Sequence, residues 1–408
     1  ALELQEGLNI IYNENPTLQT FKQELGVKDQ EINQARSGFM PDVTASYSLS
    51  DTTISPEVGQ DMDSSPSAGS IEVSQPLFTG GSTLAAFKAA KYSKESAKND
   101  YLLNQQTIFQ SATNAYLSVI TSEAVLEFNN RQVATNTEEM KRLEQRFKLG
   151  DITLPNLKEF EARLSGYIAD KYAASGKVLE AKSDFIAIFG RKAENLIWPG
   201  LSVTLPESID QAMELSRSNN PEIAKLRLLL QASEQNINIS RASFMPTVSA
   251  FASWTDNSNN YGSIDNEVTA IGITASLPLF AGGENKAKYS KSKIQKQQAA
   301  STLNQNIRDN EASAAVAFNN VSVNIQRVKA LKLRKDSFAI TTDAVTKQEQ
   351  AGEASIIDVL DARDDEFSAK VDLQLARQEL ALAKLALLAS FGKLTYTDLP
   401  STFASKEM

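Results

Sequence analysis

The strongest constraint on the fold is that the sequence contains the same unit twice. The motif Pro-Leu-Phe-x-Gly-Gly occurs at residues 76–81 and again, 202 residues later, at 278–283. Two later glycine pairs keep that spacing, and two earlier motifs recur 205 residues apart: Gly150 and Gly352, Gly190 and Gly392, Pro16 and Pro221, Phe39–Pro41 and Phe244–Pro246. Because all five pairs keep their order, we interpret the chain as a tandem duplication, with repeats at 1–205 and 206–408.

Each repeat opens with a predicted helix and continues into a predicted β-hairpin. The helices, at residues 2–36 and 207–241, stop before Phe-Met-Pro, because proline disfavours helix at the residue before it. Apolar and small polar side chains then alternate, as in VTASYSLS, which is typical of a strand with two different faces. A loop rich in Ser, Asp, Gly and Asn separates this strand from a second one. We therefore predict β-hairpins at 42–79 and 247–281.

A sharp bend and a long helical hairpin complete each repeat. Paired glycines follow the second strand, where they allow a turn that other residues resist: Gly80, Gly81, Gly282 and Gly283. The segments after them contain no proline and keep a helical pattern until Gly150 or Gly352. We predict helical hairpins at 82–190, with its tip at 149–154, and at 284–392, with its tip at 351–355. A C-terminal segment after residue 392 closes the second repeat.

The composition excludes several classes of function. The chain has 41 Lys and Arg against 50 Asp and Glu, a net charge of −9, which argues against nucleic acid as a partner. It contains neither His nor Cys, so no site can be built from the usual zinc ligands or from a thiol nucleophile. We expect no cofactor, no metal site and no catalytic residues, and hence no enzyme.

Four strands in one chain are too few for a barrel with an aqueous interior, so several copies must contribute strands. Three copies supply twelve strands, and the alternation of apolar and small polar side chains suits a barrel between lipid and water. We predict an α+β membrane protein in which a trimeric 12-stranded β-barrel, with four strands per chain, continues into a long α-helical barrel. Lysines open both long helices, where contact with anionic lipid headgroups is one reading and a solvated face is another.

Taken together, the sequence resembles the TolC-type outer-membrane efflux proteins over nearly its whole length. The resemblance rests on the duplicated Phe-Met-Pro and Pro-Leu-Phe-x-Gly-Gly motifs, the tip glycines, and IIDVLDA at 356–362. It implies a homotrimer in the Gram-negative outer membrane that extends into the periplasm and meets a periplasmic adaptor protein and an inner-membrane pump. It also implies a mixed equatorial region, to which the C-terminal segment belongs.

The function that this resemblance implies is a passive, gated exit duct of a tripartite efflux or type I secretion system. Drugs, metal ions and secreted proteins all stay open as cargo. The alternative is a soluble or fibrous coiled-coil scaffold whose apparent strands are loops. Strict alternation beside Pro-Leu-Phe-Gly-Gly favours the duct, because a scaffold does not need it.

The candidate gate is an acidic stripe just after the second tip. Asp358 and Asp361 are three residues apart and share a helix face, which Asp365 extends. In the family this position carries rings of aspartates at the channel constriction, and the resemblance transfers that role within Asp-Val-Leu-Asp. The alternative is a solvated acidic face beside a helix N-terminus, where carboxylates are favourable.

Three positions depart from the family pattern near this gate. The tyrosine and the arginine that help to close the family's channel are replaced by Glu349 and Ala354, and the partner aspartate of the first hairpin is replaced by Asn156. The family's closing network therefore does not transfer to this chain, and the sequence leaves open how the pore is held shut.

The two helical tips are candidate docking points for the adaptor. The resemblance implies this role for Leu149, Gly150, Thr153, Leu154, Ala351, Gly352 and Ser355. Ordinary turns between antiparallel helices explain the tip glycines equally well.

Overall fold

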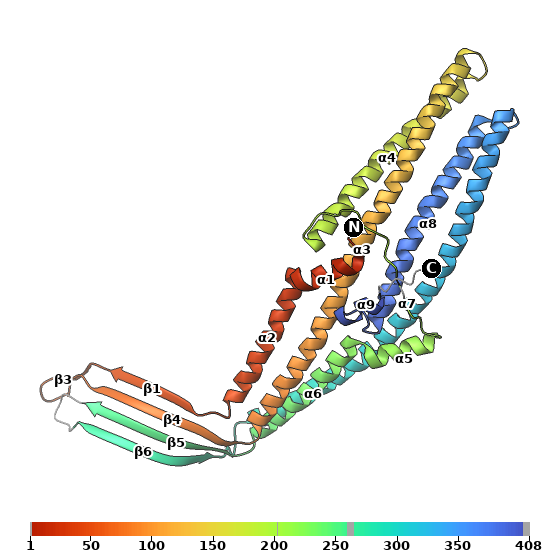
Figure 1. Ribbon diagram of the computed structural model, residues 1–408. Coiled ribbons are helices and arrows are strands. Elements are labelled where there is room, and N and C mark those ends of the chain that lie inside the picture. The colour runs from red at the N-terminus through yellow and green to blue at the C-terminus, as the bar shows by residue number, and fades with distance from the viewer. Residues whose placement is uncertain (1, 202, 259–264, 403–408) are drawn as a thin grey trace. The chain divides into compact units, whose positions relative to one another are not determined.

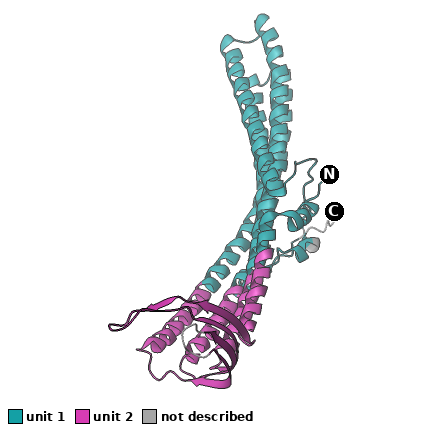
Figure 2. Ribbon diagram, turned by 90° about the vertical axis from the view of Figure 1, so that its left-hand side faces the viewer, with its two compact units in different colours: residues 1–22, 100–223, 306–408 teal, residues 23–99, 224–305 magenta. Residues whose placement is uncertain are grey.

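The computed structural model describes residues 2–201, 203–258 and 265–402. These form two compact units, shown in Figure 2. The first unit combines residues 1–22, 100–223 and 306–408, and the second combines 23–99 and 224–305. Each unit therefore takes segments from both halves of the sequence duplication. Within the described ranges, no helix is both long enough and apolar enough to cross a membrane.

A four-stranded antiparallel sheet is the main β-structure of the second unit (Figure 1). Its order is β1-β4-β5-β6, so each repeat contributes a hairpin and the central pair joins the two repeats. The register of that pair runs from Ser67 opposite Ser258 to Thr79 opposite Thr247. The strands are β1 (Asp42–Leu49), β4 (Ser67–Thr79), β5 (Thr247–Ser258) and β6 (Asn266–Ser276), and the short β2 (Thr52–Ile54) pairs with β3 (Met62–Ser64).

The Pro-Leu-Phe motif has a different place in each repeat. In the first repeat it lies inside β4, where the register shifts between Pro76 and Phe78. In the second repeat β6 ends at Ser276, before the motif, and Leu279 and Phe280 are 90% and 87% exposed. Because β4 is paired on both sides and β6 is an outer strand of the sheet, only β4 has a second neighbour to extend it.

The paired glycines lie between strand and helix, with φ values of 65° and 88° for Gly80 and Gly81 and of 58° and 85° for Gly282 and Gly283. This left-handed region strains residues with a Cβ. Gly80 is constrained further, because an added Cβ would lie 2.8 Å from the Ala242 carbonyl oxygen.

The helix predicted at the start of each repeat is in fact two helices. Asn15 and Asn220 are extended, with ψ of 121° and 125°, because the proline that follows each one disfavours the helical conformation. Each asparagine side chain then accepts a backbone N–H of the next helix. The four helices are α1 (Leu4–Glu14), α2 (Pro16–Ser37), α5 (Ile209–Asn219) and α6 (Pro221–Ala242).

The second unit packs its helices in the same way in both repeats. Phe39 meets Phe87 edge-on at 6.2 Å between ring centroids, and the equivalent pair, Phe244 and Tyr289, meets edge-on at the same distance. A lysine lies over the second ring of each pair: Lys91 over Phe87 and Lys293 over Tyr289. Two equivalent ion pairs also recur, Lys94 with Asp29 and Lys296 with Glu234.

Two helical hairpins form most of the first unit, with members α3 (Ser82–Lys148), α4 (Leu154–Phe189), α7 (Glu284–Ala351) and α8 (Ile356–Ser390). Their main core centres on Tyr116 and Phe185. The Tyr116 hydroxyl lies 2.7 Å from the carbonyl oxygens of both Leu2 and Ile197, which share its single proton. The C-terminal segment adds η1 (Tyr396–Asp398) and α9 (Leu399–Thr402), with Leu394 and Leu399 in the same core. Residues 403–408 of the predicted equatorial segment lie outside the described residues.

Candidate functional site

The first helical tip is a glycine turn with exposed apolar side chains. Gly150 has φ of 82°, and Asp151 donates its N–H to the Arg146 carbonyl at 2.9 Å. Thr153 caps α4 by accepting the N–H of Asn156. Leu149 and Leu154 are 78% and 52% exposed, so this tip presents two apolar side chains to solvent.

The second tip has the same turn but a stronger helix cap. Gly352 has φ of 80°, and Ser355 and Asp358 form a reciprocal capping box at the start of α8. The Asp358 carboxylate accepts the Ser355 N–H and hydroxyl, both at 2.8 Å, and these bonds lower its pKa. Asp358 therefore has a local structural role within one chain. Ala351, Gly352 and Ser355 are exposed.

One apolar cluster joins the two hairpins close to the tips. Its buried members come from α3, α4 and α8: Leu143, Leu157, Phe160, Ile356, Val359 and Leu360. Burying one such side chain contributes about 1.5–3 kcal/mol. The cluster is therefore the main source of affinity between the hairpins in this region.

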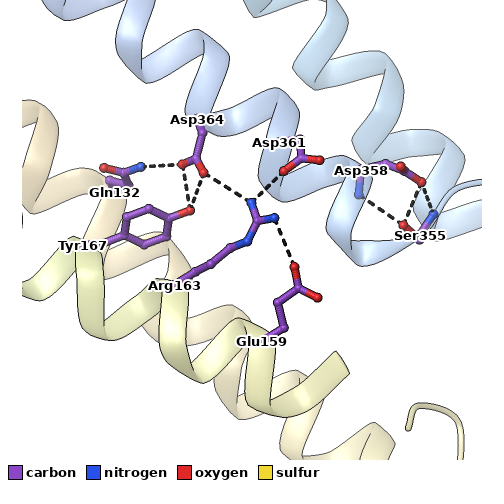
Figure 3. A network of polar contacts seen from close by, with 8 residues as sticks. All are labelled: Gln132, Glu159, Arg163, Tyr167, Ser355, Asp358, Asp361 and Asp364. Carbon is purple, nitrogen blue, oxygen red and sulfur yellow. Dashed lines mark hydrogen bonds and ion pairs between the residues drawn. The ribbon is translucent and has the colours of Figure 1, made fainter. Parts of the chain in front are cut away.

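Polar contacts also join the two hairpins, and we call them the seam; Figure 3 shows the part around Arg163. The seam residues are Gln132, Arg146, Arg163 and Tyr167 of the first hairpin and Glu349, Asp361 and Asp364 of the second. In the seam, Arg163 of α4 donates to Asp361 of α8 at 2.6 Å and to Glu159 of its own helix at 3.2 Å. The bond to Asp361 raises the pKa of Arg163. Further along the hairpins, Arg146 of α3 donates to Glu349 of α7 at 2.6 Å.

Asp364 is the seam carboxylate with the most hydrogen-bond partners. It accepts the Tyr167 hydroxyl at 2.7 Å and the Gln132 amide at 3.0 Å, and Arg163 lies 3.5 Å away. Burial raises the pKa of Asp364, although the hydrogen bond from Tyr167 and the charge of Arg163 oppose that shift. Burial also raises the pKa of Tyr167, so its hydroxyl stays protonated and donates at neutral pH.

The seam and the apolar cluster contribute differently. Asp361 is 61% exposed and Arg163 28%, and exposed ion pairs contribute only about 0–1 kcal/mol. The cluster therefore stabilises the pair of hairpins, while the seam fixes their register because each bond needs a particular alignment.

The predicted gate residues are not brought together into one site within a single chain. Asp358 caps its helix, Asp361 binds Arg163, and Asp365 is exposed on α8. Within the described part of the chain, no group of three or more acidic residues could hold a metal ion.

Sequence reasoning did not identify the first hairpin's half of the seam. Glu159, Arg163 and Tyr167 recur every four residues on α4 and so form one stripe, which was a usable signal. Glu349, noted only as a departure from the family pattern, proves to be paired with Arg146.

Comparisons with known proteins agree with this architecture. A family model described as "Outer membrane efflux protein" matches residues 8–191 and 212–393. The outer membrane efflux protein BepC of Brucella suis is 25% identical over 401 residues, covering 95% of this chain and 85% of that protein. The outer membrane protein TolC of Vibrio cholerae is 22% identical over 409 residues, covering 96% of this chain and 92% of that protein.

A solved structure shows the same fold. The outer membrane protein VceC from Vibrio cholerae superposes with a TM-score of 0.81 at 19% identity, covering 95% of this chain and 96% of that one. Such low identity supports a shared fold rather than shared details of the site.

Proposed function

The chain belongs to the outer membrane efflux protein family, and from this premise we propose that three copies form one passive exit duct. The TolC-type resemblance is confirmed, as are the location in the Gram-negative outer membrane and the channel rather than enzymatic character. The scaffold alternative is wrong, because the segments it would treat as loops form a four-stranded sheet.

The main evidence for a trimer is that the sheet has two unpaired edges. β1 and β6 are its outer strands, and large apolar side chains on both are exposed, with Tyr47 at 74% and Ile271 at 82%. Long exposed edge strands are normally covered or paired. Joining the β1 edge of one copy to the β6 edge of the next would remove every edge and produce the 12-stranded barrel, with outer-membrane lipid around it.

We assign the tips to the adaptor and the second hairpin to the gate. Leu149 and Leu154 offer the adaptor an exposed apolar contact, and the exposed Ala351 and Gly352 give the second tip only small side chains. An inner-membrane pump would load cargo through that adaptor, in efflux or in type I secretion. Around the trimer axis, Asp358 and Asp361 would form stacked rings of carboxylates, with Asp365 extending the stripe; such rings favour cations.

The seam supplies the closing contacts that the sequence left open. It ties the acidic second hairpin to the first through Arg146, Arg163 and Tyr167. Because each exposed pair contributes little, a partner that docks at the tips could displace the seam at modest cost.

Cysteine cross-linking in the outer membrane tests the trimer. These 408 residues contain no Cys, so Tyr47→Cys on β1 can be combined in turn with Cys at positions 269, 271 and 273 of β6 without background from this sequence. We expect one register to yield a covalent trimer on a non-reducing gel, and each single variant to stay monomeric. Cross-linked products of another size, or none from well-expressed protein in any register, would contradict the trimer.

A further inference from the structure

A cavity of about 250 Å³ lies in the first unit, lined mainly by α3 and α8. One face of each helix lines it, since the lining positions recur every three or four residues. The residues that matter here are Phe128, Arg131, Asn136, Arg363, Phe367 and Lys370. Gln132 lines the cavity and belongs to the seam, where it donates to Asp364; the other lining residues are outside the seam.

Two buried polar atoms at this cavity have no hydrogen-bond partner among the described residues: Arg363 Nη1 and Asn136 Oδ1. Asn136 is only 1% exposed, and its amide nitrogen donates to the Gln132 carbonyl at 2.8 Å. Among the described residues, Arg363 pairs with Glu139, at 3.8 Å from Nη2, and Glu139 is shared with Arg142. A buried donor and a buried acceptor left unpaired are each costly.

The other lining residues indicate which kind of molecule could hydrogen-bond to both Arg363 and Asn136. Three cations, Arg131, Arg363 and Lys370, line the cavity against one carboxylate, Glu366, so the lining is positive on balance. Glu366 pairs with Lys370 at 2.6 Å, and Arg131 pairs with Glu127 of its own helix at 2.8 Å. Phe128 and Phe367 supply apolar walls. Guanidinium groups bind carboxylates in a planar geometry, and aromatic rings pack against other rings.

We propose that this cavity binds a small aromatic carboxylate that also carries a hydrogen-bond donor. Its carboxylate pairs with Arg363, its ring packs between the two phenylalanines, and its hydroxyl or N–H donates to Asn136. A single-ring acid fits within the volume. The site belongs to the chain itself and does not depend on the proposed duct or on its cargo.

Isothermal titration of the purified full-length chain with 4-hydroxybenzoate tests the site. We expect saturable binding, and binding about tenfold or more weaker for Arg363→Met and for 4-hydroxybenzamide, which lacks the charge. Arg142→Met is the matched control, because Arg142 shares Glu139 but does not line the cavity; it should bind like the unmodified chain.

A second variant distinguishes loss of the binding site from loss of the fold. Thr135→Phe fills the cavity from the α3 side without changing charge, and it should abolish binding while circular dichroism and thermal unfolding stay unchanged. Absence of saturable binding to the unmodified chain would overturn the proposal. So would equal binding of the acid and the amide, or equal binding by Arg363→Met.

Discussion

The two repeats are alike near the sheet and unlike near the tips. In the second unit the same ring pair, cation–ring contact and ion pair occur in both repeats. In the seam, by contrast, the first hairpin donates through Gln132, Arg146, Arg163 and Tyr167, and the second accepts through Glu349, Asp361 and Asp364. At the common spacing of 202, Arg163 even aligns with a residue of opposite charge, Asp365.

The difference follows from what each region contacts. The contacts that recur near the sheet form within each repeat, from the α2 segment to α3 and from the α6 segment to α7, so both repeats can keep the same packing. Two hairpins that bind each other face unlike surroundings, and identical charges at their contact would repel. Within the seam, divergence of the duplicated unit into donor and acceptor sides avoids that repulsion.

The largest expected effect comes from the acidic stripe of the second hairpin. Asp358→Asn with Asp361→Asn should abolish block by multivalent cations and remove cation preference in planar bilayers, because the ring charge is lost. Asparagine at 358 can still accept from Ser355, so the helix cap is retained. Glu159→Gln, at the equivalent position of the first repeat, is the control and should keep the block. If Glu159→Gln loses the multivalent-cation block to the same extent, the block does not depend on the second hairpin in particular.

A smaller effect is expected at the tips, where only the first exposes large apolar side chains. Leu149→Gln should weaken binding of the adaptor about fivefold, equivalent to about 1 kcal/mol of lost contact, without changing thermal stability. Leu179→Gln is the control, because Leu179 is 69% exposed on α4 outside the tip. Adaptor pull-down at matched expression is the measurement, and unchanged retention by Leu149→Gln would exclude this tip from docking.

Within the seam, Tyr167→Phe should lower the free energy of unfolding by about 1 kcal/mol, because the partly buried Asp364 loses a donor. The pKa of Asp364 should rise further for the same reason. Tyr172→Phe is the control on the same helix, where Tyr172 is 72% exposed. If denaturant unfolding gives both variants the same free energy of unfolding, the hydrogen bond from Tyr167 to Asp364 does not stabilise the fold.

The smallest effect is pH dependence. Burial raises the pKa of Asp364, so the folded chain takes up this proton at a higher pH than the unfolded chain, and acidification from neutral toward about 4 favours the protonated folded form. Arg163 then loses one anionic neighbour, and conductance should rise slightly. Asp358, whose pKa is lowered, contributes stability above its unfolded pKa and loses it only at lower pH. A conductance step that persists in Asp364→Asn would assign the titration elsewhere.

The sequence predicted the features that depend on local chemistry. Gly80 and Gly352 were identifiable because a sharp bend or helix stop needs positive φ, and the strands because their side chains alternate. The break at Asn15 was missed, although Pro16 gave the signal, because helical periodicity continues across it.

Long-range pairing could not be read in the same way. The contact of Arg163 with Asp361 depends on the alignment of two hairpins that are 198 residues apart in sequence. The early end of β6 at Ser276 depends on which strands have a second neighbour, although the motif after it matches that of β4.

Charge exchange across the seam tests most directly whether the unlike hairpins hold the duct closed. Single-channel conductance should be compared for Arg163→Asp, Asp361→Arg and the double exchange. Lys158→Glu is the control, because Lys158 pairs with Glu161 of its own helix and lies outside the seam. Each seam variant alone should raise the open fraction about fivefold. The double exchange should recover part of that change, because it restores the pair between positions 163 and 361 but leaves Glu159 and Asp364 without their arginine. Additive opening in the double exchange, or no opening in either single variant, would contradict the account.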